Sequence, residues 1–340
     1  HIPAPLHLIV ALMRDNGFTV SERYRALKMV IRLAMAHFSL DEDISVHELL
    51  LKYSQTPELI QGLWEPLCLA ALNTPIDYAS AEIFLNVLRD SFSRYRSDSD
   101  VLFFKTNLSR FLAVPAREYI AQHGGQIRLA SKVSQLQIIN NQISAVVLDQ
   151  EVIPARQVVM ATPADITRKL LNSALPGVVP AYQYEPICTV YLQYPEPVRL
   201  PTLMTGLINA TSHWAFEHSI IHQPSHNFSA NTSRSCVIAV VISGPGQHMK
   251  LDNKSLALKV HQELDKIIGQ LPAYSQYQVI REKKATFSCQ VGIQKQRPAC
   301  TTAVKGLYLA GDYTDTDYPA TLEGAVKSGF TAAQAVTESA

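Results

Sequence analysis

No stretch of this sequence approaches the roughly 18 consecutive apolar residues that a membrane-spanning helix needs. The five cysteines are scattered and form no CxxC pair, which argues against a disulfide framework or a zinc site and favours a reducing, cytoplasmic setting. Neither sign of charge is in excess, because the formal net charge is +1, so nothing indicates a nucleic-acid partner.

A further absence concerns phosphate binding. No strand–GxGxxG–helix occurs, because the glycines of Gly124-Gly125 and of Gly244-Pro245-Gly246 lack a strand before them and a helix after them. The chain starts at His1 instead of methionine, and the residues that follow read like the interior of a protein. We therefore expect a fragment or a trimmed chain.

What is present is a globular composition, 47% hydrophobic and 17% charged, in a chain long enough for two domains. Apolar residues at helical spacing dominate the first part of the chain, and strands mix with helices after it. Helices are expected from Ser21 onward and at 43–53, 57–72, 80–93, 115–123, 256–268 and 321–336, and strands at 126–136, 143–148, 157–161, 189–194, 237–242 and 306–311. This order predicts a fold that combines α/β and α+β parts.

The most informative stretch lies near the carboxyl end. A short apolar strand ends at Gly311-Asp312, and a helix rich in small residues begins after Thr321. Gly311 allows a close approach of the backbone to a ligand, Asp312 can accept hydrogen bonds from hydroxyls, and the helix N-terminus favours an electron-rich oxygen. Gly324 and Gly329 each cost the helix about 1 kcal/mol against alanine, which suggests that something flat packs against it. A plain strand–turn–helix with small-residue packing is the alternative.

This stretch resembles the C-terminal flavin motif of the amine-oxidase/phytoene-desaturase superfamily. The resemblance implies a two-domain, FAD-linked oxidoreductase architecture that here lacks the N-terminal βαβ nucleotide-binding unit. It places Asp312 near the ribityl–phosphate region of FAD and the backbone from Thr321 to Gly324 at the isoalloxazine ring. Gln126 to Val133 resembles the strand whose valine meets the adenine. The residues that the resemblance assigns to FAD are Val133, Gly311, Asp312, Thr321, Leu322, Glu323 and Gly324.

Several segments are similar to hydroxysqualene dehydroxylases in particular, above all residues 63–75, with others at 3–7, 79–84, 185–192, 213–216, 281–287 and 297–298. This similarity implies the reduction of hydroxysqualene to squalene and an apolar isoprenoid substrate. Two alternatives stay open: a carotenoid-type desaturase or other flavin amine oxidase, and a truncated chain that folds without cofactor. Amine oxidases usually carry an aromatic residue where Thr321 stands, which disfavours that class.

The sequence does not identify the catalytic group or the oligomeric state. Asn73, Asp77 and Tyr78 are candidates to assist departure of a hydroxyl, although the segment also suits a helix stop. For the walls of the substrate pocket we expect apolar side chains from two helices and one strand. They are Trp64, Leu67, Leu72, Phe84 and Leu192.

We expect the substrate domain to comprise the helical residues 1–112 and the β-rich residues 172–297, and the flavin domain to comprise 113–171 and 298–340. The basic residues of the first helices form either a membrane-facing surface, on the inner face of a membrane, or a solvated face. They are Arg14, Arg23, Arg25, Lys28 and Arg32. The histidines 213, 218, 222 and 226 are expected to be solvated, and no metal site is expected.

Overall fold

The structure is a computed structural model that describes residues 17–92, 95–149, 151–221 and 236–339, together with residue 10 and residues 12–14. The first part of the chain is helical. Its elements are α2 (Val20–Met35), α3 (Val46–Lys52), α4 (Pro57–Leu59), the π-helical turn η1 (Ile60–Trp64), α5 (Glu65–Leu72) and α6 (Ala81–Phe92). Thr19 and Ser45 each form a capping box with a glutamate three residues later, which satisfies the first free amides of α2 and α3.

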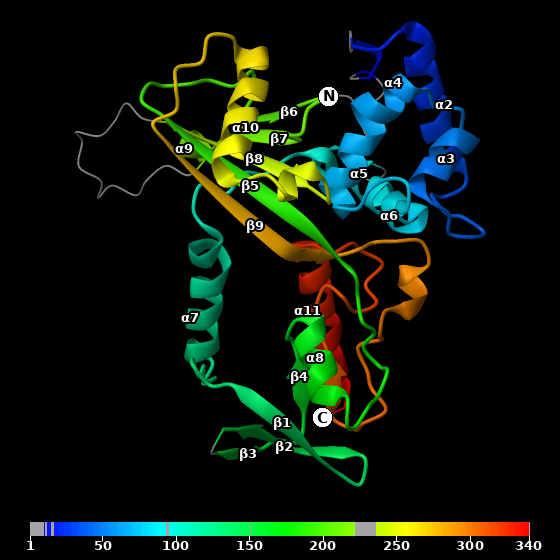
Figure 1. Cartoon of the computed structure of the whole chain (residues 1–340). Helices are drawn as coiled ribbons and strands as arrows, with labels where there is room; N and C mark the ends of the chain where they lie inside the picture. Colours follow the sequence, from blue (N-terminus) through cyan, green and yellow to red (C-terminus); the bar gives the residue numbers. More distant parts are fainter. Residues whose placement is uncertain are drawn as a thin grey trace.

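The largest sheet is antiparallel, with the strand order β6-β7-β8-β5-β9. Its strands are β5 (Tyr184–Tyr194), β6 (Met204–Gly206), β7 (Trp214–Glu217), β8 (Cys236–Ser243) and β9 (Gln276–Phe287). Helix α10 (Asn253–Ile268) lies across one face of this sheet (Figure 1). Alternate residues of β5 point to opposite faces, so Val190 and Leu192 are buried in the hydrophobic cluster that includes α10, whereas Thr189 and Tyr191 face the other way.

Two smaller sheets complete the fold. The antiparallel sheet β1-β2-β3 contains Val133–Ile139, Gln142–Leu148 and Val152–Pro154, and follows α7 (Val114–Gln122). The parallel pair consists of β4 (Val158–Met160) and β10 (Leu307–Leu309), with α8 (Ala164–Leu171) after β4 and α11 (Leu322–Glu338) at the end of the chain. Gln157 donates a hydrogen bond to the carbonyl of Val336, which fixes the end of α11 beside β4.

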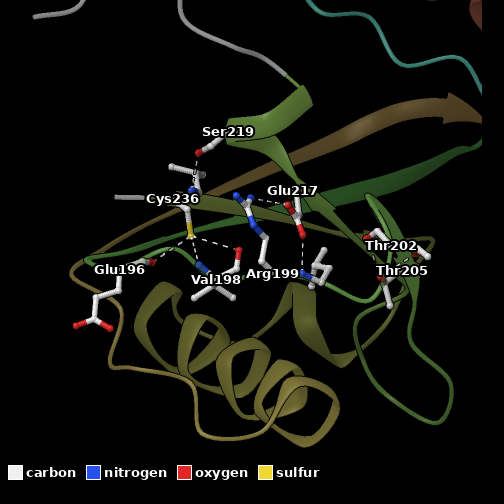
Figure 2. Close-up of polar contacts among 10 residues, drawn as sticks. Glu196, Val198, Arg199, Thr202, Thr205, Glu217, Ser219 and Cys236 are labelled. Carbon is white, nitrogen blue, oxygen red and sulfur yellow. Dashed lines mark hydrogen bonds and ion pairs between the residues drawn. The ribbon is translucent and has the colours of Figure 1, made fainter. Parts of the chain in front are cut away.

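A buried carboxylate fixes the connection between β5 and β6. Glu217 accepts hydrogen bonds from the amide of Leu200, at 2.6 Å, and from Arg199, at 3.1 Å (Figure 2). On the neighbouring strand, the Cys236 sulfur accepts a hydrogen bond from the amide of Val198. The charge-assisted bonds to Glu217 hold the end of the long β5–β6 connection against the sheet.

The predicted mixture of helices and sheets is confirmed, and so are most predicted elements. The strand predicted at 126–136 begins only at Val133, because β1 has no strand partner before that residue, and β3 was not predicted. One hydrophobic cluster includes Leu33 and Phe84 of the helical part together with Leu136 and Leu307, so it crosses the domain border predicted after residue 112. The domain division stays a prediction. Among the described residues, no helix has the length and hydrophobicity to cross a membrane.

Candidate functional site

The N-terminus of α11 offers two free hydrogen-bond donors. Thr321 caps the helix by accepting a hydrogen bond from the amide of Gly324, at 3.1 Å. The amides of Leu322 and Glu323 have no acceptor within the described part of the chain, and the helix dipole adds positive potential there. A side chain at position 324 would place its Cβ 3.0 Å from the carbonyl oxygen of Pro319, so glycine lets the preceding loop close over the helix start.

The loop before α11 presents a carboxylate beside this helix. The amide of Gly311 donates to the hydroxyl of Ser328 on α11, which ties the end of β10 to the helix. Burial raises the pKa of Asp312, and the nearby Arg297 guanidinium opposes that shift. Within the described residues the carboxylate of Asp312 accepts hydrogen bonds from backbone amides but from no side chain, so it keeps acceptor capacity for the hydroxyl groups of a ligand.

Arg297 organises this loop, a role that sequence reasoning missed. Its Nη2 donates to the carbonyl of Asp312 and the hydroxyl of Thr316, both at 2.7 Å, and its Nη1 donates to the carbonyl of Tyr318, also at 2.7 Å. Only 6% of the residue is exposed, its Nε lacks a partner, and it forms no ion pair with a described residue. Burial lowers the pKa of the guanidinium. The pair Arg297-Pro298 is similar to hydroxysqualene dehydroxylases in sequence, but the sequence does not show that the Arg297 side chain is buried.

An apolar groove of about 390 Å³ adjoins the start of α11. It lies on the face of the large sheet opposite α10, and Leu322 forms part of its wall. No carboxylate lines it among the described residues, and aromatic and aliphatic side chains predominate. Its lining residues are Leu102, Phe103, Phe104, Thr106, Leu108, Thr189, Tyr191, Phe216, His218, Ile221, Ala239, Val241 and Leu322.

The five residues predicted as pocket walls are not in this groove. Trp64, Leu72 and Phe84 are buried in the main hydrophobic cluster, with Leu67 packed against it. The indole nitrogen of Trp64 donates to the side chain of Gln55 at 2.9 Å, which satisfies the tryptophan inside the helical core. Leu192 lies beneath α10, on the other face of β5 from the groove. Its neighbours on β5, Thr189 and Tyr191, line the groove instead.

The three candidate catalytic residues also lie outside the groove. Asn73 ends α5 in a left-handed conformation, and its amide bridges the carbonyl of Pro186, the hydroxyl of Thr286 and the amide of Gly244. Because both polar atoms of its side chain are used in this way, Asn73 connects the helical part to the large sheet. Asp77 is mostly exposed and lies 3.3 Å from His47.

Tyr78 belongs to a small polar network. Its hydroxyl donates to the buried carboxylate of Glu185 at 3.0 Å, and Ser288 donates to the same oxygen at 2.8 Å. Burial raises the pKa of Tyr78, and the charge of Glu185 adds to the shift. The tyrosine is therefore protonated near neutral pH and acts as a hydrogen-bond donor. None of these three residues lines the groove.

The residues present fit one half of a flavin nucleotide. Free amides at Leu322 and Glu323 suit carbonyl oxygens of an isoalloxazine ring, and Asp312 suits ribityl hydroxyls. Val133 is not part of this cluster: it begins β1, whose partner strand β2 donates a hydrogen bond from Ile143 to the carbonyl of Lys305, before β10.

The sequence indicates only some of the residues that line the groove. The segments 185–192 and 213–216, which contain Tyr191 and Phe216, are similar to hydroxysqualene dehydroxylases. This similarity assigns no role to either residue. Successive residues of β5 alternate between two faces of the sheet, but this alternation does not show which face α10 covers. The 102–108 segment is apolar but has no helical or strand period, so nothing in it pointed to a pocket wall.

Comparison with known proteins identifies the family of this chain. A family model described as flavin containing amine oxidoreductase matches residues 3–337. Hydroxysqualene dehydroxylase of Rhodopseudomonas palustris is 30% identical over 282 residues, which are 82% of this chain and 62% of that protein. A 15-cis-phytoene desaturase of an Oncidium hybrid cultivar is 25% identical over 374 residues, 99% of this chain and 60% of that protein. The chain thus spans 62% and 60% of the lengths of these two relatives.

Solved structures show the same fold at lower identity. A putative protoporphyrinogen oxidase from Exiguobacterium superposes with a TM-score of 0.63 at 16% identity, covering 97% of this chain and 75% of the other. Cyclohexylamine oxidase from Brevibacterium oxydans gives 0.62 at 12% identity, covering 86% and 67%. The family match over residues 3–337 and the curated relatives confirm the predicted superfamily and its FAD cofactor. The chain belongs to the flavin-containing amine oxidoreductase family.

Proposed function

We propose that this chain forms the substrate-facing part, and one half of the flavin site, of an FAD-dependent oxidoreductase that reduces hydroxysqualene to squalene. The observation that carries the proposal is the 30% identity with a hydroxysqualene dehydroxylase over 82% of the chain. The apolar groove beside Leu322 supports it, because a long hydrocarbon requires walls with few polar groups.

The residues of the chain would position the substrate and exclude water. When bound, fully reduced FAD would supply both the hydride that replaces the allylic hydroxyl and the proton with which that hydroxyl leaves as water. Phe103, Phe104 and Phe216 would hold the hydrocarbon, and Tyr191 and His218, whose rings are 5.5 Å apart, would place hydrogen-bonding groups near the departing oxygen. We also propose that residues 1–112 and 172–297 form a substrate domain and that residues 113–171 and 298–340 form a flavin domain.

Tyr191→Phe is expected to slow squalene formation by about tenfold to a hundredfold, because it removes a hydroxyl that would hydrogen-bond to the leaving oxygen. Single-turnover assays with reduced FAD measure this rate. Tyr194→Phe is the matched control, since Tyr194 lies on the same strand but bonds to His261 beneath α10. Equal rates in the two variants would remove Tyr191 from the reaction.

Asp312→Ala is expected to weaken FAD binding by about tenfold or more, because a charge-assisted hydrogen bond to a cofactor hydroxyl is lost. Titration of the apoprotein with FAD, followed by flavin fluorescence, measures the dissociation constant. Asp315→Ala serves as the control, because this exposed carboxylate belongs to the same loop and bonds to Gln294. An unchanged dissociation constant in a folded Asp312→Ala protein would place the cofactor elsewhere.

A carotenoid-type desaturase is the second candidate, favoured by the match to a phytoene desaturase over 99% of the chain. Incubation with hydroxysqualene and with phytoene, followed by product analysis, separates the two reactions. Squalene formation supports the first proposal, and new double bonds in phytoene support the second. A flavin absorbance spectrum of the purified chain tests the remaining alternative, which is a chain that folds without cofactor.

A further inference from the structure

Helix α2 packs on the helical core with only one side. Ala26, Met29 and Leu33, spaced by three and four residues, are almost completely buried there. Figure 1 shows α2 at the outer edge of the helical part, away from the sheets. Most of the helix surface therefore faces outward, although the helix belongs to a well-packed core.

An apolar row runs along this outer side. The exposed fractions are 69% for Val20, 63% for Tyr24, 48% for Ile31 and 77% for Met35. These residues follow one another by four, seven and four positions, which places them on one face of the helix. An exposed row of this kind, four side chains long with an aromatic ring in it, indicates an interaction surface and not isolated surface residues.

A basic row lies directly beside the apolar one. Arg25, Lys28 and Arg32 are exposed and recur by three and four positions. Lys28 and Arg32 have no carboxylate partner among the described residues. The only acidic residue of α2 is Glu22, which is occupied at the N-cap by Thr19. The positive charge of this face is therefore available to an outside partner.

We propose that this outer face of α2 docks on an anionic lipid bilayer, with the helix lying in the plane of the surface. The apolar row enters the boundary between headgroups and acyl chains, while the basic row contacts anionic headgroups. A contact between two copies through the same face would bring like charges together, so charge complementarity favours the lipid surface. The inference rests on α2 alone and is independent of the proposed substrate.

Sedimentation of the full chain with vesicles tests this surface. We expect binding to mixed phosphatidylcholine–phosphatidylglycerol vesicles at low salt, weaker binding at high salt, and little binding to pure phosphatidylcholine. The double variant Lys28→Gln with Arg32→Gln should lower the partition coefficient by about tenfold or more, because each basic residue near an anionic surface contributes about fivefold.

The apolar row is tested separately by Ile31→Ser with Met35→Ser, which should abolish the binding that survives at high salt. Leu258→Ser with Lys266→Gln changes an exposed apolar and an exposed basic position on α10 and should bind like the parent chain. All these positions are on the surface, so circular dichroism and thermal unfolding should match the parent.

Three results would overturn the proposal. The first is a parent chain that does not sediment with anionic vesicles at low salt. The second is α2 variants that bind as well as the α10 control does. The third is a parent chain that self-associates in light scattering, with Ile31→Ser and Met35→Ser making it monomeric but leaving vesicle binding unchanged; the row would then be a contact between copies.

Discussion

Replacing Arg297 by methionine is expected to lower the free energy of unfolding by about 3 kcal/mol or more. Methionine fills a similar space but leaves the carbonyls of Asp312 and Tyr318 and the hydroxyl of Thr316 without their buried donor. Hydrogen bonds from a charged donor contribute about 1.5–3 kcal/mol each, so the loss exceeds the gain from removing a desolvated cation. Urea unfolding, followed by circular dichroism, measures the change.

The same substitution should weaken FAD binding by more than tenfold, because the loop that carries Asp312 loses its anchor. Arg297→Lys keeps the charge but not the planar fork, so it should fall between the parent and methionine in both measurements. Arg168→Met is the control, since Arg168 is exposed and makes only a 3.7 Å ion pair, worth about 0–1 kcal/mol. If the lysine variant equals the parent, the fork geometry is irrelevant and only the charge matters.

Gly306→Ala should be about as damaging, through the backbone instead of through hydrogen bonds. Gly306 has φ of 78°, and a Cβ there would lie 2.2 Å from the carbonyl oxygen of Arg156 and 2.8 Å from a methyl carbon of Ile143. The backbone at Gly306 and the backbone at Arg156 cannot move apart freely, because Val158 donates a hydrogen bond to the carbonyl of Gly306 where β4 pairs with β10. We expect a loss of about 3 kcal/mol or more, from left-handed strain and steric overlap together.

Gly177→Ala isolates the two contributions. Gly177 has φ of 80° but open space around the position of a Cβ, so alanine there should cost only about 1–2 kcal/mol from the backbone conformation. The difference between the two variants in urea unfolding measures the steric part. Equal losses at both glycines would show that the contact with Arg156 relaxes at no cost.

Local features of the sequence were sufficient to predict α11 and the strand before it. A capping threonine, a glycine at the third helical position and an apolar strand ending in Gly311-Asp312 are signals confined to a short segment. Most of the helices of the first part were predicted for the same reason. Elements whose residues carry their own start and stop signals can be read without knowledge of their neighbours.

Residue roles that depend on distant partners could not be read in this way. The sequence makes Asn73 a candidate to assist departure of a hydroxyl, but the partners of its amide group are 113 and 213 positions away in the sequence. Trp64 is expected from the sequence in a pocket wall, but it is buried in the main hydrophobic cluster and its indole donates to Gln55. The apolar groove joins strands, a helix and the irregular 102–108 segment, which only the folded chain brings together.

The two-faced character of β5 has a consequence for how such a protein can diversify. Val190 and Leu192 maintain the packing under α10, whereas Thr189 and Tyr191 face the groove from the same strand. Substitutions at the second pair can reshape the space available to a ligand while the free energy of unfolding stays almost unchanged. New ligand preferences are therefore accessible by single mutations in β5 that need no compensating change elsewhere in the chain.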